Sequence, residues 1–195
     1  MPTSATSGRR QAHKGETERR IHHCALALTD ERGVDGWTMD ELADAANVSR
    51  RTLFNYYACK VDAVLSGPPD IPDDALDAFH RGGPTGRVLD DLLVLAEALM
   101  AESSDTILTK RRVLAASPRL LAIERERFET IMQELGDHVL RREGAAFGST
   151  RARLLVHLLV SIFDASLHQL GELQDGRPLA ELFDHNVRQA RDLLA

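Results

Sequence analysis

The sequence of 195 residues is poor in cysteine and has no long apolar run. Its two cysteines, Cys24 and Cys59, exclude the disulfide framework that stabilises many small secreted domains, and they fit a reducing compartment. No run approaches the ~18 apolar residues of a membrane span, and residues 1–16 lack the apolar segment of a signal peptide. We therefore expect a cytoplasmic protein that has no membrane as a partner.

The sequence also lacks an overall basic excess, since its formal net charge is −6. The imbalance belongs to the later part: residues 1–60 carry 9 basic against 8 acidic side chains, whereas residues 61–195 carry 15 against 22. Any affinity for nucleic acid must therefore arise from a local patch rather than from the charge of the whole chain. With 43% hydrophobic residues the chain is globular, and its length fits one domain or a small domain joined to a larger one.

A short helix is predicted directly after Thr38. Thr38 and Glu41 have the T-x-x-E spacing of a capping box, in which each side chain accepts a hydrogen bond from the other residue's backbone N–H. The apolar positions of this helix follow the i, i+3, i+4, i+7 rule and are Met39, Leu42, Ala43 and Ala46. The pattern stops at Asn47, a residue that tolerates the left-handed backbone of a tight turn.

A second helix is predicted to follow at once, with Ser49 as its N-cap. Leu53 and Tyr57 lie four positions apart and share the buried face of this helix with Val48. The side chains that this arrangement directs outward are Arg50, Arg51, Asn55 and Tyr56. Taken alone, arginines on a short helix more often solvate a surface than read a ligand, because basic runs are weak motifs.

The outward side chains match the chemistry of a DNA major groove. Arginine pairs bidentately with the edge of guanine and asparagine with the edge of adenine, which predicts base contacts by Arg50, Arg51 and Asn55. Hydroxyl and ammonium groups suit phosphate oxygens. The predicted phosphate contacts are Thr38, Thr52, Tyr56 and Lys60.

The segment from Gly33 to Lys60 reads GVDGWTMDELADAANVSRRTLFNYYACK and resembles the N-terminal signature of the TetR family of bacterial transcriptional regulators. The resemblance covers about residues 15 to 66. Three positions depart from the family pattern: Asn47 stands in place of the usual turn glycine, Tyr57 in place of phenylalanine, and Cys59 where serine or threonine caps the fourth helix. We expect Cys59 to cap that helix poorly, and none of the three departures removes a predicted DNA contact.

The resemblance implies an all-α fold with a three-helix, helix-turn-helix DNA-binding domain and a larger helical C-terminal domain for ligand binding and dimerisation. We predict a flexible tail over residues 1–16, the DNA-binding domain over 17–66, and the C-terminal domain over 67–195. The first helix should begin near Thr17 and end at Gly33. His22 and His23 are adjacent and so point in different directions, which favours solvated side chains over a metal pair.

Residues 67–195 are expected to be helical throughout. Apolar periodicity predicts helices over residues 74–80, 88–102, 107–116, 117–143, 150–170 and 178–194, with Pro118 in the first turn of the fourth of these. The helix from residue 150 is the most apolar. The resemblance implies that the last two helices pair with those of a second copy in a homodimer, for which a helix apolar on two faces is suited.

Four polar residues form one stripe along that apolar helix, at positions i, i+4, i+7 and i+11: His157, Ser161, Asp164 and His168. Burial of such groups without partners costs a few kcal/mol each. Three interpretations stand open: a hydrogen-bond network between helices or subunits, the lining of an effector pocket, or a metal or catalytic site. The last has least support, because three turns are too long a spread for one ion.

The apolar wall of an effector pocket has five candidates, Phe79, Met100, Phe128, Met132 and Phe163. The last four, with His157, Ser161, Asp164 and His168, make up the predicted pocket. The ordinary core of a helical bundle is the favoured interpretation of each apolar candidate, because any such bundle needs an apolar stripe. The identity of an effector is not written in these residues.

Together these features predict a TetR-like repressor that binds a palindromic operator as a homodimer and releases double-stranded DNA when a small-molecule effector binds. We expect no enzymatic activity, no cofactor and no metal, because the sequence offers no nucleophile with a base and no phosphate loop. The alternative is a helical small-molecule-binding protein or enzyme whose DNA-binding domain is vestigial. A third possibility is a regulator that answers to a protein partner.

Overall fold

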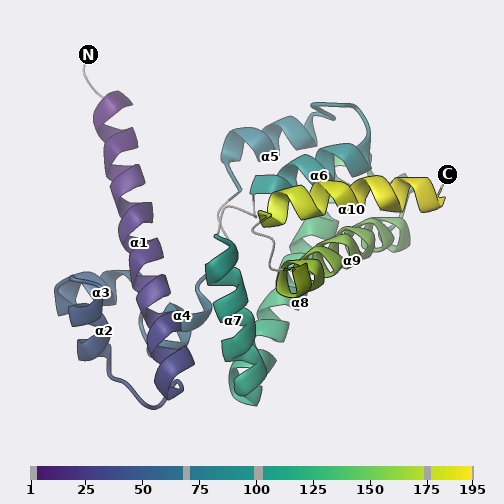
Figure 1. Ribbon diagram of the computed structural model, residues 1–195. Helices are drawn as coiled ribbons and strands as arrows, with labels where there is room; N and C mark the ends of the chain where they lie inside the picture. The colour runs from purple at the N-terminus through teal and green to yellow at the C-terminus, as the bar shows by residue number, and fades with distance from the viewer. Residues whose placement is uncertain (1–3, 68–70, 99–102, 174–176, 195) are drawn as a thin grey trace. The chain divides into compact units, whose positions relative to one another are not determined.

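Figure 1 shows the computed structural model, which describes residues 4–67, 71–98, 103–173 and 177–194. Every regular element within those ranges is a helix, which confirms the all-α fold class. The chain divides into two compact units. The head consists of Met1–Gly67 with Thr109–Ala122, and the body consists of Pro68–Leu108 with Ile123–Ala195.

The head contains four complete helices, α1 (Ser4–Arg32), α2 (Met39–Ala45), α3 (Arg50–Tyr56) and α4 (Lys60–Leu65). Helix α1 packs against α2 and α4, and α2 packs against α3 (Figure 1). The first helix therefore begins at Ser4, thirteen residues before the expected start at Thr17, and takes in most of the region predicted as a tail. Residues such as alanine, glutamine, arginine and glutamate sustain a helix without an apolar stripe, so the missing periodicity did not reveal it.

The core of the head contains two buried polar side chains that are hydrogen-bonded to each other, Thr29 and Trp37. The indole Nε1 of Trp37 donates a hydrogen bond of 3.0 Å to Thr29 Oγ1, and that hydroxyl donates to the carbonyl oxygen of Ala25 at 2.7 Å. Both side chains are buried, so each polar atom has the partner that burial demands. The apolar residues of this core that are fully enclosed are Ile21, Ala25, Leu26, Trp37, Leu42, Ala46, Leu53, Ala63, Val64, Leu65 and Leu120.

His22 corrects one of our expectations. Its side chain is buried rather than solvated, and its ring Nδ1 lies 2.9 Å from the carbonyl oxygen of Ala63. His23, by contrast, is exposed as expected. Adjacent residues on a helix point in different directions, so one of the two histidines faces α4 and contributes a polar contact between α1 and α4.

The remaining elements are α5 (Asp73–His80), α6 (Val88–Ala98), α7 (Ser104–Ala116), α8 (Pro118–Glu143), the 3-10 turn η1 (Ala145–Phe147), α9 (Ser149–Leu173) and α10 (Leu179–Leu194). Their bounds agree with the predicted ranges to within a few residues, and Pro118 does open α8. The division between head and body falls within α7 and α8, since Thr109–Ala122 belongs to the head.

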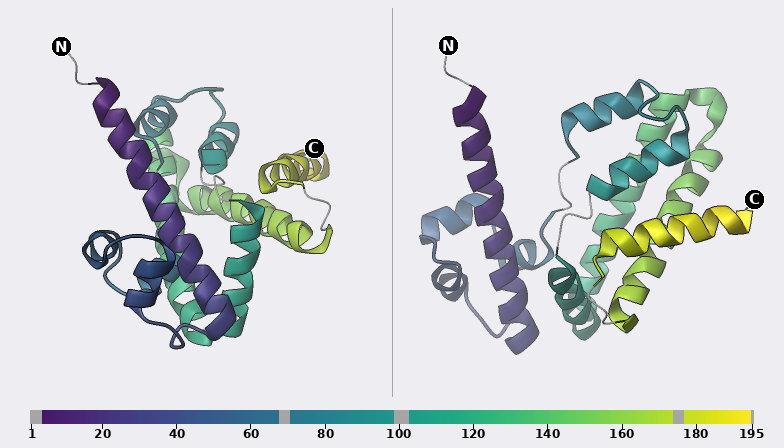
Figure 2. Two further views of the ribbon diagram at one scale, coloured as in Figure 1. Left: turned by 60° about the vertical axis from the view of Figure 1, so that its left-hand side comes forward. Right: turned by 45° about the horizontal axis from the view of Figure 1, so that its top comes forward.

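The core of the body is formed largely by α6, α8, α9 and α10. Helix α10 packs along α9, which both views in Figure 2 show. The buried face of α9 is formed by Ala152, Val156, Leu159, Ile162, Ser166 and Leu170. Ser166 is satisfied there, because its hydroxyl donates to the Ile162 carbonyl oxygen at 2.7 Å and accepts from Asn186 Nδ2 at 3.0 Å.

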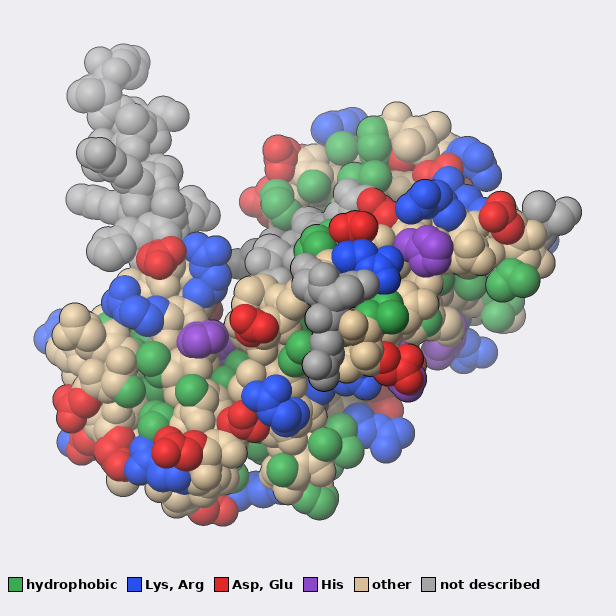
Figure 3. Space-filling view, viewed as in Figure 1, with side chains coloured by type: hydrophobic (Ala, Val, Ile, Leu, Met, Phe, Trp, Pro, Cys, Tyr) green, Lys and Arg blue, Asp and Glu red, His purple; other side chains and the backbone are tan. Residues whose placement is uncertain are grey.

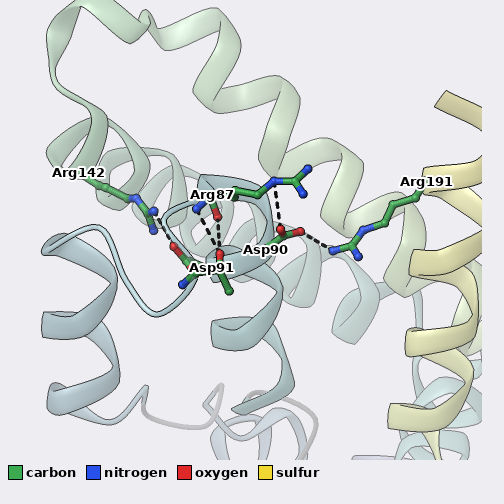
Figure 4. A network of polar contacts seen from close by, with 6 residues as sticks. Arg87, Asp90, Asp91, Arg142 and Arg191 are labelled. Atoms are coloured by element: carbon green, nitrogen blue, oxygen red, sulfur yellow. Dashed lines mark hydrogen bonds and ion pairs between the residues drawn. The ribbon is translucent and has the colours of Figure 1, made fainter. Parts of the chain in front are cut away.

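A network of arginines and aspartates joins three helices of the body (Figure 4). Arg142 of α8 donates to Asp91 of α6 over 2.6 Å, with exposed side-chain fractions of only 3% and 0%. The second Asp91 oxygen accepts from the backbone N–H of Thr85 at 2.6 Å. Arg191 of α10 pairs with the neighbouring Asp90. The Phe79 ring centroid lies 4.7 Å from the Arg142 guanidinium carbon, so the buried cation also faces an aromatic ring.

Two histidines meet within the same unit. His80, at the end of α5, places Nε2 3.0 Å from Nδ1 of His138 on α8, and the two rings are tilted with centroids 5.1 Å apart. Burial lowers the pKa of His138, and the neighbouring His80 and Arg141 lower this pKa further, against opposing contributions from Glu134 and Asp137. His138 is therefore neutral in the folded protein over a wider pH range than an ordinary histidine.

Helix α9 corrects the expectation that no segment of the chain is long and apolar enough to span a membrane. Within the described residues it is long and apolar enough to cross a membrane by length and composition alone. The core helix of a soluble protein passes the same test, and α9 buries an apolar face against α10 and the rest of the body. Packing within the body accounts for only part of this hydropathy, since 28% of the apolar window is buried there.

Candidate DNA-binding surface and body cavity

The capping box predicted for α2 is present. Thr38 Oγ1 accepts from the Glu41 backbone N–H at 3.2 Å, and Glu41 Oε2 accepts from the Thr38 backbone N–H at 2.7 Å. Hydrogen bonds from Arg32 and then from Thr38 hold the pKa of the exposed Glu41 carboxyl below its ordinary value. The reciprocal caps fix where α2 begins and so orient the helix that precedes the turn.

The turn between α2 and α3 has the backbone that the sequence predicted. Asn47 adopts a φ of 50°, the left-handed conformation that asparagine tolerates where family members carry glycine. Ser49 then caps α3 by accepting from the Thr52 backbone N–H at 3.0 Å. Cys59 makes no side-chain cap at the start of α4, which agrees with the expected weakness of that cap. Helices α2 and α3 form a helix-turn-helix.

Helix α3 has one buried and one exposed face. Leu53 is fully buried and Tyr57, just past the helix, is buried as well, which anchors α3 on the core of the head. Arg50, Arg51 and Asn55, the three predicted base readers, are all exposed on this short helix. A helix anchored on one face and presenting amide and guanidinium groups on the other has the build of a recognition helix.

Arg50 is not a free cation in this structure. Its Nε lies 3.2 Å from Asp40 Oδ1, and its guanidinium carbon lies 5.7 Å from the ring centroid of Phe54. Phe54 is itself 44% exposed and belongs to the same face. Sequence reasoning missed Phe54, although its spacing of four residues from Arg50 would have placed it among the outward side chains.

The predicted phosphate contacts differ in how freely their polar groups are presented. The exposed Thr38 hydroxyl donates to Glu41 at 2.9 Å, and the half-buried Thr52 hydroxyl lies 2.8 Å from Ser49 Oγ. Tyr56 is half-buried. The Lys60 ammonium lies 3.3 Å from the carbonyl oxygen of Val34 and 5.1 Å from the centroid of the Trp37 ring, so Lys60 also holds the head together.

The charges of the head are mixed rather than of one sign. Acidic and basic side chains are interspersed over the face in Figure 3. Ion pairs join Arg32 to Glu41 over 2.8 Å and Arg19 to Glu16 over 3.2 Å. This agrees with the near balance of charge in residues 1–60. A DNA contact must therefore depend on a few well-placed cations.

The end of α7 is tied to the rest of the head by two polar contacts. Arg112 Nη2 donates to Asp30 Oδ2 of α1 at 2.7 Å, and this hydrogen bond raises the pKa of the guanidinium. Lys110 Nζ donates to the carbonyl oxygen of Leu65, at the end of α4, over 2.9 Å. No local pattern in the sequence predicts these contacts, because 82 and 45 residues separate the partners.

The body holds a cavity of about 430 Å³ between α8 and α9. Three of the predicted pocket residues line it, namely Phe128, Met132 and His157. Apolar side chains dominate the lining, which also includes Leu140, Ala152, Val156 and Val160, and its charged residues are Glu129, Asp137 and Arg153. Phe163 packs against the core cluster of the body instead, and Met100 lies outside the described residues.

The polar stripe of α9 requires a correction. His157, Ser161, Asp164 and His168 are all exposed, so the stripe is not buried within the chain, and only His157 lines the cavity. Ser161 donates to the His157 carbonyl oxygen at 2.9 Å, and His168 Nδ1 lies 3.4 Å from Glu172. The network between α9 and α10 is formed instead by Ser166, Gln169 and Asn186. The described residues contain no group of three side chains placed to hold a metal ion.

The head contains a capped helix-turn-helix with two arginines and an asparagine exposed, and the body contains a cavity. This combination is typical of one-component transcriptional regulators, in which one chain carries both a DNA-binding and a ligand-binding domain. Residues 21–62 match the family model of the bacterial regulatory proteins of the tetR family. The helix-turn-helix region is therefore of the tetR type, which supports a role for the chain as a DNA-binding regulator of transcription.

Two relatives describe the wider similarity. The chain is 29% identical over 154 residues to MftR of Mycobacterium tuberculosis, a proposed mycofactocin biosynthesis transcriptional regulator, and the match covers 74% of this chain and 73% of that protein. It is 27% identical to Thermus thermophilus FadR, a TetR family transcriptional repressor solved in complex with lauroyl-CoA. That match covers 88% of this chain and 91% of FadR at a TM-score of 0.41, too low to establish a shared arrangement of the whole chain.

Proposed function

We propose that this protein is a cytoplasmic, effector-responsive repressor that binds a palindromic operator as a homodimer. Two copies of α3 would enter successive major grooves, at half-sites about 34–36 Å apart or a multiple of that distance. Binding of a small molecule in the body would lower the affinity for DNA, and a coupling of ~1–3 kcal/mol between the two sites is sufficient for induction.

The observation that carries the proposal is the exposed face of α3. Arg50, Arg51 and Asn55 extend from a helix whose other face is anchored by Leu53, so all three are exposed. Arg50 would exchange its surface ion pair with Asp40 for a contact with a base edge. We assign base readout to these three residues. The phosphate contacts that would set the position of the head are assigned to Thr38, Thr52, Tyr56 and Lys60.

Selection of bound duplexes from a random pool tests this assignment. We expect the purified wild type to enrich a palindrome and the Arg50→Ala/Arg51→Ala variant to enrich none. An Arg125→Ala/Arg141→Ala variant removes the same charge from exposed positions of α8 and should recover the wild-type motif. Equal enrichment by all three proteins would contradict the role of α3, and enrichment by none would contradict DNA reading by the head.

We place the effector in the cavity between α8 and α9. Its volume of about 430 Å³ falls within the range of small-molecule sites, and it combines an apolar wall with a few charged groups, as such sites do. Phe128 and Met132 would contact the apolar part of an effector, while His157 and Arg153 are positioned to hydrogen-bond a polar group.

Filling the cavity tests its role. Gly136 lines the cavity, and a Cβ atom built there meets nothing within 4 Å, so Gly136→Leu should begin a side chain in open space and occupy part of the cavity. We expect this variant to lose binding of an apolar fluorescent dye that the wild type takes up. Thr130→Leu, at an exposed position of α8 outside the lining, should retain it. Equal dye binding by both variants would place the site elsewhere.

The homodimer is proposed to form through α9 and α10. Leu154 is 63% exposed on α9, on a face that also carries the polar stripe of His157, Ser161 and His168. A second copy would cover this apolar surface and give the stripe partners. We expect a dimer in sedimentation experiments, a monomer for Leu154→Asp, and a dimer for Val94→Asp, which alters an exposed apolar residue of α6. A wild-type monomer would contradict the proposal.

A further inference from the structure

Phe54 is an exposed aromatic residue in the middle of the recognition face. It is 44% exposed, while Leu53 beside it is fully buried. Its neighbours on the same face are Arg50 one turn before it and Asn55 directly after it, both exposed. Exposure of an aromatic ring forgoes the stabilisation that its burial would provide, so the ring is available to a ligand that the head binds.

The only apolar group on a base edge of the major groove is the C5-methyl of thymine, and phenylalanine is one of the side chains that contact it. Phe54 has no hydrogen-bonding atom in its side chain, so it adds nothing to the polar readout by Arg50, Arg51 and Asn55. We propose that Phe54 is a specificity-determining residue that reads a thymine methyl group. This inference rests on the DNA-binding function proposed above and deepens it.

The geometry of α3 also places the thymine in the operator. Phe54 follows Arg50 by four residues, which is about one helical turn or ~5.4 Å along the helix axis. Base pairs are stacked about 3.4 Å apart. Phe54 therefore reads a thymine close to the guanine that Arg50 contacts. The Arg50 guanidinium already lies over the Phe54 ring at 5.7 Å, so the two side chains approach the groove together.

Replacement of thymine by deoxyuridine tests the proposal, because it removes the methyl group and leaves every hydrogen-bonding atom of the base pair in place. Each thymine of the selected operator is replaced in turn, and the affinity of the full-length protein is measured. We expect one position per half-site at which the substitution weakens binding about fourfold, as for one buried methyl group. Substitution in both half-sites should weaken binding about fifteenfold if the two are independent.

Variants of Phe54 assign the effect to this residue. Phe54→Ala should bind the thymine and deoxyuridine duplexes equally. Phe54→Leu should keep part of the discrimination, because leucine still contacts a methyl group but cannot stack on Arg50. Discrimination that is kept by Phe54→Leu and lost by Phe54→Ala would come from contact with the methyl group. Discrimination that is lost by both variants would depend on the stacking of Arg50 on the aromatic ring. Val94→Ala truncates an apolar side chain of α6 that is 42% exposed, and it should discriminate like the wild type.

Two results would overturn the inference while leaving the proposed function intact. One is a wild-type protein that selects an operator and is indifferent to deoxyuridine at every position. The other is a Phe54→Ala variant with undiminished discrimination, which would assign the methyl contact to another residue. If the wild type selects no operator, the proposed function fails, and the inference fails with it. A thermal melt of each variant verifies that the head remains folded, as expected for a substitution at an exposed position.

Discussion

The head and the body use charged side chains in opposite ways. In the head the ion pair of Arg50 with Asp40 lies at the surface and holds a cation on the recognition face. In the body Arg142 and Asp91 are almost fully buried and join α8 to α6. Surface pairs contribute little to stability, whereas breaking a buried pair strands a charge. Loss of a charge should therefore reduce DNA binding in the head and folding stability in the body.

The largest effect is expected at Asp91. Asp91→Ala removes the buried carboxylate that pairs with Arg142 Nη2 and leaves Glu143 as the other partner of the guanidinium, and it should lower the free energy of unfolding by ~3–5 kcal/mol. Urea denaturation measures this loss. Arg142→Met/Asp91→Leu should recover most of the stability, because it removes both charges together. A single variant as stable as the wild type would show that the buried pair does not support the body.

In the head the matching substitution is Arg50→Ala. It should cost ~1–3 kcal/mol of binding free energy to the selected operator and relax specificity at one base pair per half-site. The free energy of unfolding should change little, because the pair with Asp40 is exposed. Titration of wild-type and mutated operators measures both parts. Equal losses of affinity on all sequences would identify Arg50 as a phosphate contact.

A smaller difference in stability is expected between substitutions of one glycine in the body, Gly136, and one in the head, Gly33. Gly136 of α8 has open space at the position of a Cβ, so Gly136→Ala should raise the free energy of unfolding by about 0.5–1 kcal/mol, the usual gain within a helix. Gly33 ends α1 with a φ of 72°, and Gly33→Ala should destabilise the protein instead. Thermal melts of the two variants measure opposite shifts if this account holds, and shifts of the same sign contradict it.

The smallest expected effect is a pH dependence in the body. The pKa of His138 is lower in the folded protein than the usual ~6.5 of an unfolded chain, so the unfolded state binds the proton first as the pH falls. The corresponding stability is present above about pH 6.5 and is lost as the pH falls below it towards the folded pKa. His138→Gln should flatten the dependence of the unfolding midpoint between pH 7.5 and pH 5.5. An unchanged slope would place the responsible group elsewhere.

Local signals predicted the helix-turn-helix in detail. The cap at Thr38, the left-handed turn at Asn47 and the cap at Ser49 each depend on residues within a few positions of one another, and all three are present. The exposure of the predicted base readers followed from the same periodicity. Most helices of the body were also predicted, because their apolar positions repeat at helical spacing.

The errors concern contacts that local patterns do not encode. His22 was expected in solvent because adjacent histidines cannot share a metal, but its environment is set by α4, some forty residues further along the chain. The stripe from His157 to His168 was treated as buried because its surroundings in the sequence are apolar, yet that face of α9 is open within the chain. Phe54 is an exception: it was assigned no role, although its spacing of four residues from Arg50 places it on the outward face.

The composition of the head limits how this protein can be recombined with its relatives. A chimaera cut near residue 67 would appear to exchange the DNA-reading part as one continuous piece. That cut would leave behind Thr109–Ala122 and so separate Asp30 and Leu65 from the arginine and lysine that hold them. A transplanted DNA-binding domain should keep its native contacts only if the graft also carries the end of α7 and the first turn of α8 as a second piece.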